Sequence, residues 1–507
     1  MKKLYFILAV LTVMLAITSC GGIGEILDKP LGGGTKKFWA HNIDTGMYYQ
    51  IEAEKFAENT RCVVWVDKKS GVNKRTAEMV ASAYNDVYDK MISVFGWTKP
   101  TEISDSKKVN MNTMDYAHWI ATEEASNARL TILLLDIKDG YLKEGDPYVA
   151  GYFQPLNIFE NDPEDDNYKY SNALDMIYLD TYPSEPGSPD SNETLAHEMQ
   201  HLMNFVTRIK KYEDGDIDDF DIMDTWIDEG LSTAAEWVYS GEHPEIRWAY
   251  YNTDPSGLIK LGNNFYVWDN HDDNPQANLD DYATAYLFFQ YLRLQKNEGI
   301  YKSILNSKFY NYKAVTYAAG YNDDWSRLLL DWLSANYINN NGTYGYMNDP
   351  TLKQIKAPMV PSGYYSLPLY PGEGVYSKSN GSRPSGSGNI KYEELTSSSG
   401  TARLTYNTNT NFTVDENTGK INSTPETGLT TGIAPSVGIS IPGSGSVQIN
   451  QKKFTGPFKV DASYFLRRNK SGGMHNEIRN LISRSVSKGK NTLRFDLSTL
   501  ERVSIDE

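Results

Sequence analysis

The spacing of apolar side chains predicts one long helix early in the chain and four more in its middle part. In residues 72–95 most apolar side chains are three or four positions apart, which is the spacing of one face of an α-helix. The same spacing returns at 193–206, 228–239, 281–295 and 324–338. We therefore expect an amphipathic helix that packs on a sheet, followed by a region built from helices.

Short and nearly unbroken apolar runs predict the strands of that sheet. The clearest are 62–66, 130–137 and 176–180, and a weaker extended segment covers 149–156. Apolar runs of this length are typical of strands that are buried on both faces. Strands mixed with a helix, and then followed by helices only, indicate an α+β fold.

The composition changes in the last third of the chain. Ser, Thr, Gly and Asn become frequent, and short alternating runs at 402–406, 446–449 and 492–497 predict strands. Residues 377–388 are expected to form an exposed loop. We therefore predict a β-rich accessory module over 355–507, all-β in class, that folds separately from the rest.

The N-terminus has the features of an export signal. Lys2 and Lys3 precede an apolar run over 4–17, which is shorter than the about 20 residues that span a bilayer. The sequence Ile-Thr-Ser-Cys that ends at Cys20 resembles a bacterial lipoprotein signal, in which the cysteine is lipidated. The resemblance implies a signal peptide over 1–19 and a chain anchored by lipid in the cell envelope, at the outer membrane or cell surface. Ordinary secretion with loss of Cys20 is the alternative.

Composition and charge limit the classes of partner. The 507 residues include 65 acidic and 49 basic side chains, for a formal charge of −16. We expect no nucleic-acid partner, since such binding depends on Lys and Arg at the phosphates. An aromatic content of 12% indicates a chain that folds. The two cysteines exclude a disulfide framework, and we expect Cys62 to be a buried thiol on a strand.

One segment carries recognisable chemistry, because His197, Glu198 and His201 form the pattern H-E-x-x-H. With seven His in the chain, chance would produce this pattern on the order of 0.01 times. Four positions apart on a helix, two imidazoles can bind one metal ion with the Glu beside it. The apolar stripe of this helix lies opposite, so we expect the His pair to face a cleft or solvent, and Asp190 with Glu193 to form a capping box. A surface helix with two ordinary His is the alternative.

A catalytic zinc ion needs a third protein ligand and an open position for water. A metzincin would supply a third His at position 207, but this chain has Thr207. The next helix offers Glu229 as the best candidate, with Glu236 or His243 as the fallback. Glu229 and Glu236 share the polar face of their helix, which a solvated face would also explain.

These motifs resemble the gluzincin metallopeptidases, and most closely the hyicolysin family. The resemblance covers about residues 38–340 and implies a zincin-like fold, with one zinc ion bound by the His pair and Glu229, and with Glu198 as general base. The segments that carry it are TILLLDI at 131–137, MIYLDT at 176–181, TLAHEMQH at 194–201 and WIDEGLS at 226–232. Together these observations divide the chain into the signal peptide 1–19, a flexible tether 20–37, an N-terminal α+β subdomain 38–192, the active-site helix and helical subdomain 193–354, and the module 355–507.

The chain departs from the best-known gluzincins at two places. The interval between His201 and Glu229 is long and contains the acidic stretch 213–221, which we interpret as an inserted, solvated loop. Calcium binding there is possible, but the stretch does not have the pattern of an EF-hand loop. Position 233 is Thr where the thermolysin-like pattern has an Asp that orients a His ligand. If a His ligand is oriented in this way here, another group must do it, and Glu236 and Asp228 are the candidates.

The expected function is that of a lipid-anchored zinc endopeptidase acting on proteins or peptides outside the cytoplasm. Tyr282 is the catalytic candidate for binding the oxyanion, with Tyr286 as the alternative. Residues 150–154 are a candidate edge strand for pairing with the substrate backbone. A chain that ends near residue 350 should then keep its activity. The rival hypothesis is a lipid-anchored surface protein with a binding or adhesive function, built on an inactive zincin scaffold.

Overall fold

The structure is a computed structural model. The predicted signal peptide, Cys20 and the predicted strand at 446–449 lie outside the described residues. The described residues are 34–96, 129–143, 147–159, 161–165, 168–217, 221–268, 277–360, 366–379, 384–412 and 423–429, together with the short strands at 110–111, 114–115, 458–459, 493–495 and 502–505.

A six-stranded mixed sheet forms one end of the molecule, in the order β1-β2-β3-β6-β9-β8. The first three strands are antiparallel neighbours, β3, β6 and β9 run parallel, and β8 pairs antiparallel with β9 at the edge. The sheet and the helices described below make this an α+β protein. The strands are β1 (Thr35–Asn42), β2 (Met47–Glu58), β3 (Cys62–Asp67), β6 (Leu130–Leu135), β8 (Gly151–Phe153) and β9 (Met176–Asp180).

The central strands β6 and β9 are buried along their whole length. One face of the sheet packs with helix α2 (Lys74–Phe95) in the main core, and the other face forms a second apolar cluster around Leu133, Tyr178 and Phe38. Coverage on both faces explains why the sequence shows continuous apolar runs there. Strand β2 was not predicted because only Ile51 and Ala53 of its twelve residues are buried, so its pattern is mostly polar.

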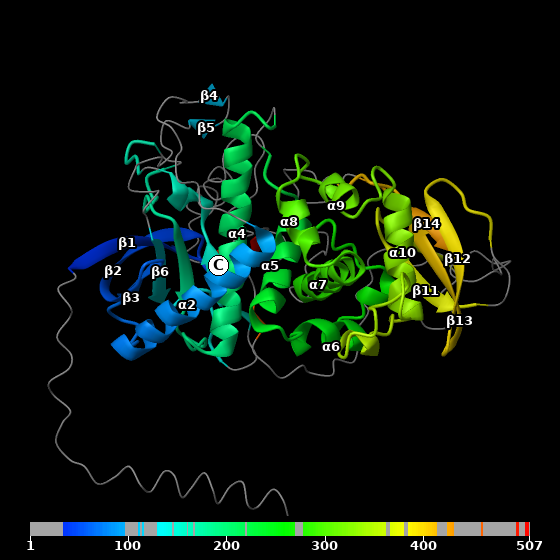
Figure 1. The fold of residues 1–507 in the computed structure, drawn as a ribbon, viewed down its shortest axis with the longest axis horizontal. Coiled ribbons are helices and arrows are strands. Elements are labelled where there is room, and N and C mark those ends of the chain that lie inside the picture. The colour runs from blue at the N-terminus through cyan, green and yellow to red at the C-terminus, as the bar shows by residue number, and fades with distance from the viewer. Residues whose placement is uncertain are drawn as a thin grey trace, which may run out of the picture.

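The helices form the middle of the molecule, and Figure 1 shows α4 standing between the sheet and the helices from α5 to α10. All five predicted helices are present. Helices α6, α8 and α9 were not predicted because they are too short to show a periodic pattern. After α2 the helices are α4 (Pro189–Glu213), α5 (Thr225–Ser240), α6 (Glu245–Thr253), α7 (Ala277–Lys296), α8 (Gly299–Leu305), α9 (Tyr312–Ala318) and α10 (Trp325–Ile338).

Helix α4 begins one turn before its predicted start. Ser188 is the N-cap, and its hydroxyl accepts a hydrogen bond from the backbone N–H of Ser191. Pro189 follows as the first helical residue, where its missing N–H costs nothing. The predicted capping box of Asp190 and Glu193 is therefore wrong, because both residues already lie inside the helix.

The strands between residues 366 and 429 lie at the opposite end from the large sheet, and Figure 1 shows them beside α10. The predicted strand at 402–406 lies within β13, and the segment 377–388, predicted as an exposed loop, begins inside β11 with Ser377 buried. β11, β13 and β12 form one sheet, and β10 pairs with β14. These strands are β10 (Ser366–Leu369), β11 (Gly374–Lys378), β12 (Ile390–Ser397), β13 (Gly400–Asn407) and β14 (Glu426–Leu429).

These strands share the main core with the helices. The Tyr376 hydroxyl donates to the carbonyl of Leu333 on α10 at 2.6 Å. The Phe412 ring, just after β13, stacks on Tyr266 at 5.0 Å and lies edge-on to Trp325 at 5.4 Å. The β strands and α10 are therefore joined by buried aromatic contacts.

The remaining elements are short, and no helix of the described residues is long and apolar enough to cross a membrane. β4 pairs with β5, β7 with β15, and β16 with β17. They are η2 (Pro155–Ile158), η3 (Ile259–Leu261), η4 (Leu352–Gln354), β4 (Asn110–Met111), β5 (Met114–Asp115), β7 (Pro147–Tyr148), β15 (Phe458–Lys459), β16 (Leu493–Phe495) and β17 (Arg502–Ile505).

Candidate metal centre

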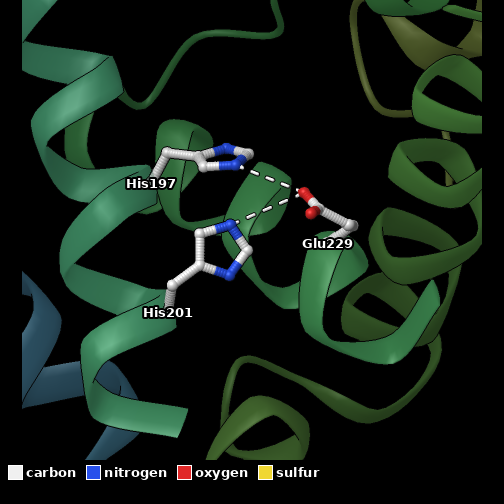
Figure 2. Close-up of side chains that lie close together, drawn as sticks. All are labelled: His197, His201 and Glu229. Atoms are coloured by element: carbon white, nitrogen blue, oxygen red, sulfur yellow. Dashed lines mark ion pairs between the residues drawn. The ribbon is translucent and has the colours of Figure 1, made fainter. Parts of the chain in front are cut away.

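Helices α4 and α5 bring three potential metal ligands together. Figure 2 shows His197 and His201 on α4 pointing at Glu229, which lies on α5. Glu229 Oε2 is 3.4 Å from His197 Nε2 and 3.6 Å from His201 Nε2. Among the described residues, this is the only group of three or more His, Cys, Asp or Glu side chains whose ligand atoms all lie within 4.8 Å of one another.

The spacing of these atoms fits a zinc ion. Ligands at about 2.0–2.1 Å from one ion in a tetrahedron are about 3.3–3.4 Å apart, close to these two separations. Both carboxylate oxygens of Glu229 are buried and accept no hydrogen bond from any described residue. A buried carboxylate without donors is costly, and a cation between it and the two imidazoles would remove that cost.

A carboxylate on α5 orients His197. Its Nδ1 lies 3.0 Å from Oε1 of Glu236. Because a carboxylate can only accept, the imidazole carries its proton on Nδ1, and the lone pair on Nε2 faces Glu229. Glu236 thus lies behind the ligand, and it is not part of the ligand group for which it was the predicted fallback.

A second carboxylate orients His201. Its Nδ1 lies 2.9 Å from Oδ2 of Asp228 and 3.0 Å from the hydroxyl of Ser232. Asn204 donates to the other oxygen of Asp228 and holds it in place. The sequence left open whether Glu236 or Asp228 orients a His ligand in place of an Asp at position 233. In the structure Glu236 contacts His197 and Asp228 contacts His201.

The charge of Glu236 is stabilised by a buried arginine. Burial by itself would raise the pKa of Glu236, but the Arg247 guanidinium and the His197 imidazole outweigh it and lower the pKa to about 2. Arg247, on α6, donates to Glu236 at 2.9 Å. Sequence reasoning did not identify Arg247, because α6 was not predicted and no spacing rule connects it to the motif.

The site lies deep in the protein. Glu229 and His201 are fully buried, and Glu198 and His197 are 1% and 4% exposed. The polar faces of α4 and α5 therefore face each other, and the solvated-face interpretation of Glu229 and Glu236 is wrong. Glu198 lies on α4 between the two His, as the motif requires.

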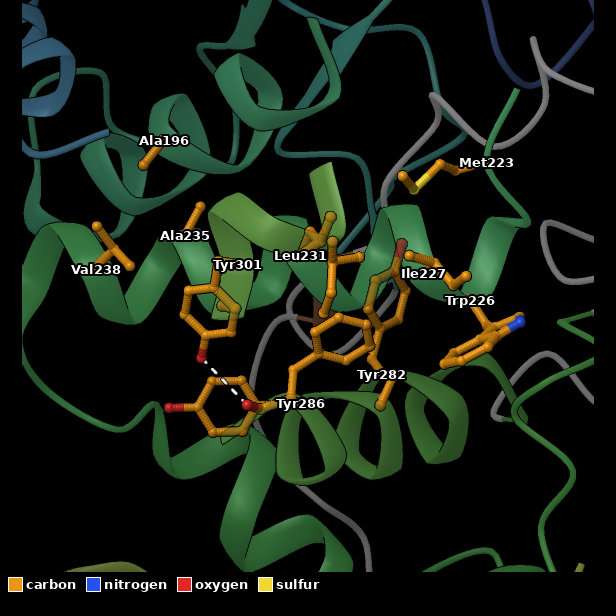
Figure 3. Packing of buried hydrophobic residues seen from close by; sticks show 14 of the residues in the cluster. Ala196, Met223, Trp226, Ile227, Leu231, Ala235, Val238, Tyr282, Tyr286 and Tyr301 are labelled. Atoms are coloured by element: carbon orange, nitrogen blue, oxygen red, sulfur yellow. Dashed lines mark hydrogen bonds between the residues drawn. The ribbon is translucent and has the colours of Figure 1, made fainter. Parts of the chain in front are cut away.

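Close packing of α5 on α7 sets the position of Glu229. Gly230 follows Glu229, and a side chain at that position would overlap the Phe289 ring of α7. Figure 3 shows Leu231 and Ala235 of α5 on the side of buried tyrosines of α7 and α8, namely Tyr282, Tyr286 and Tyr301. The glycine therefore allows the approach of two helices next to the ligand.

The two candidate oxyanion donors occupy different places on α7. The Tyr282 ring lies 6.4 Å from the His197 ring and 4.8 Å from the Arg247 guanidinium. The Tyr286 hydroxyl instead lies 2.6 Å from Nδ1 of His243, and Nε2 of His243 lies 3.1 Å from Asp349. His243, the other predicted fallback ligand, belongs to this separate cluster.

The predicted inserted loop is only partly a loop. Its first residue, Glu213, is the last residue of α4, and Lys211 pairs with Asp216 at 3.6 Å. Residues 218–220 lie outside the described part of the chain. No described residue of this segment belongs to a group that could hold a cation, so the calcium hypothesis gains no support.

Comparison with known proteins found similarity to a metalloprotease, a class of protein that has a metal site. The chain is 32% identical over 267 residues to a protein named neutral metalloprotease ShpI, from Staphylococcus hyicus. The match covers 49% of this chain and 54% of that protein, so the chain spans about half the length of its relative. No model of a known protein family matches the chain.

Proposed function

We propose that this protein is a zinc-dependent endopeptidase of the gluzincin type, with a zincin-like arrangement of its sheet and helices and a likeness to the hyicolysin family. The observation that carries the proposal is the buried group of His197, His201 and Glu229, in which both imidazoles are held by carboxylates. The identity to a neutral metalloprotease supports the same activity.

The residues around the site account for the proposed chemistry. His197, His201 and Glu229 would hold the zinc ion, which would supply Lewis acidity and make a water molecule acidic enough to react at neutral pH. Glu198 takes the proton of the attacking water and delivers it to the leaving amine. Tyr282, whose ring lies 6.4 Å from the His197 ring, donates a hydrogen bond from its hydroxyl to the developing oxyanion.

The substrates we propose are proteins or peptides outside the cytoplasm, reached by an enzyme anchored through lipid on Cys20. β8 is the edge strand beside α4, but its three residues are buried in the structure, so the candidate pairing of this strand with an extended substrate backbone gains no support. The rival function, surface binding on an inactive scaffold, has less support, since such a scaffold does not need a base at position 198.

The test measures zinc and hydrolysis on the same protein. We expect one zinc ion per chain and hydrolysis of an unfolded protein that a chelator stops and added zinc restores. His201→Ala should lose the zinc, because two protein ligands hold the ion too weakly. Glu198→Gln should keep the zinc and lower kcat by about 10²- to 10⁴-fold, because the amide cannot accept the proton.

Glu193→Gln is the matched control, as it removes a carboxylate from the first turns of the same helix. It should leave both zinc content and hydrolysis unchanged. Full zinc occupancy in His201→Ala would refute the metal site, and normal turnover by Glu198→Gln would refute the mechanism.

A further inference from the structure

A buried ion pair lies directly behind one of the proposed zinc ligands. Oε1 of Glu236 is 3.0 Å from Nδ1 of His197 and 2.9 Å from an amino nitrogen of Arg247. The side chains of Glu236 and Arg247 are 11% and 6% exposed. One carboxylate oxygen therefore joins the α4 imidazole to the α6 guanidinium.

The geometry gives Arg247 two buried contacts at the site. The guanidinium also lies over the ring of Tyr282 at 4.8 Å, and Trp268 packs edge-on against the same ring at 4.9 Å. A planar guanidinium held between a carboxylate and an aromatic face has little freedom to turn. Arg247 is therefore placed to fix the direction of the Glu236 carboxylate.

Charge points to the same role. A buried carboxylate that lost its cationic partner would be strongly destabilised and would change its position. That movement would release the hydrogen bond that keeps the proton of His197 on Nδ1. His197 could then rotate, and its Nε2 would no longer be held toward Glu229.

We propose that Arg247 is a positioning residue of the metal centre, holding Glu236 against His197 so that Nε2 of His197 stays directed at the ion. Arg247 itself contacts neither the ion nor, in this role, the substrate. This inference rests on the proposed function, because it requires that His197 binds zinc.

The test is the affinity for zinc, measured by competition with a chelating dye, together with the visible spectrum of the cobalt-substituted protein. Arg247→Met should bind zinc about 10- to 100-fold more weakly than the wild type, as is usual when support behind a ligand is lost. Its cobalt bands should shift, because they report the ligand geometry and not the overall stability.

Arg293→Met is the matched control. Arg293 also has a largely buried side chain, 10% exposed, which stacks on an aromatic ring, at 3.6 Å from Trp237, and lies near a carboxylate, at 3.9 Å from Asp349. It belongs to the His243 cluster and not to the metal ligands. This variant should keep the wild-type zinc affinity and cobalt spectrum even if it melts at a lower temperature.

A second pair of variants tests whether Arg247 acts through Glu236. In the Glu236→Gln background, the further change Arg247→Met should leave the zinc affinity within about threefold, since the carboxylate to be positioned is already gone. This comparison also replaces the single variant if Arg247→Met does not fold, because the double variant buries no unpaired charge.

The outcomes separate this inference from the proposed function. A wild-type protein that takes up no zinc would refute the proposed function itself. If the wild type binds zinc, and Arg247→Met has the same zinc affinity and the same cobalt spectrum, the role of Arg247 is refuted but the proposed function is not. The role of Arg247 is also refuted if Arg247→Met lowers the zinc affinity by the same factor in the wild-type background and in the Glu236→Gln background.

Discussion

At the scale of single residues, the two tyrosines of α7 differ in what their hydroxyl groups can reach. Tyr282 lies beside His197, whereas the Tyr286 hydroxyl is bound to His243. The sequence could not separate them, because both lie on the same helix four positions apart. Their different neighbours lead to different expectations for the removal of each hydroxyl.

Tyr282→Phe should lower kcat by about 10²- to 10³-fold with little change in KM, because a donor to the oxyanion acts mainly in the transition state. Tyr286→Phe should leave kcat unchanged and lower the free energy of unfolding by about 1–3 kcal/mol, because it leaves His243 without this partner. Steady-state kinetics and urea denaturation on both variants check this. The reverse pattern would assign the oxyanion role to Tyr286.

The lowered pKa of Glu236 predicts how stability depends on pH. Its folded pKa of about 2 lies below the ordinary value of 4.5, so its ionised form stabilises the fold above about pH 4.5. That contribution, on the order of 3 kcal/mol, is lost as the pH falls from about 5 towards 2, because the unfolded state takes up the proton first.

We therefore expect the stability difference between wild type and Glu236→Gln, both free of zinc, to shrink on acidification. Urea denaturation between pH 6 and pH 3 measures it. Glu242→Gln is the control, since it removes an exposed carboxylate just beyond the end of the same helix. A difference that stays constant with pH would mean that Glu236 is not ionised in the folded protein.

At the scale of elements, the contact between α5 and α7 determines where Glu229 lies. Gly230→Ala should push the two helices apart, because the added methyl group overlaps the ring of Phe289. We expect a loss of about 1–3 kcal/mol in the free energy of unfolding and a weaker affinity for zinc. Denaturation and chelator competition measure the two effects.

A second substitution on α7 provides the control for this contact. Phe289→Leu removes the edge of the ring, so the double variant with Gly230→Ala should recover part of the zinc affinity lost by the single one. No recovery would show that the glycine is needed for the backbone of α5 and not for its approach to α7.

At the scale of the whole molecule, the strands between residues 366 and 429 cover the helical core. A protein that ends at residue 350 would lack Phe412 and Tyr376 and would expose the faces of Tyr266 and Trp325. Tyr266 packs in turn on Trp226, three positions before Glu229. The change in composition suggested that such a protein keeps its activity. The packing leads to the opposite expectation, because the shortened protein would lose part of its core.

We expect the protein ending at residue 350 to melt about 10 °C or more below the full chain, or without cooperativity, and to bind zinc poorly. A protein ending at residue 429 keeps the strands β10 to β14 and serves as the control. Calorimetry and zinc content test both. A shortened protein that melts cooperatively, binds zinc and hydrolyses an unfolded substrate would restore the interpretation of a separate module.

The sequence by itself determined the parts of this protein that depend on near neighbours in the chain. The positions of His197, Glu198 and His201 on one helix follow from the 3.6-residue period, and the buried strands follow from continuous apolar runs. Helix α5 and its Glu229 were found in the same way, with the resemblance to a known family adding the expected ligand set.

Only the tertiary structure decided what each polar face contacts. A face that is buried against another polar face has the same pattern in the sequence as a face in water, so the burial of Glu229 and Glu236 was not predicted. The contacts of Asp228, Glu236 and Arg247 join α4, α5 and α6 over long separations in the chain. No local spacing rule encodes such contacts, because they exist only once the helices have packed.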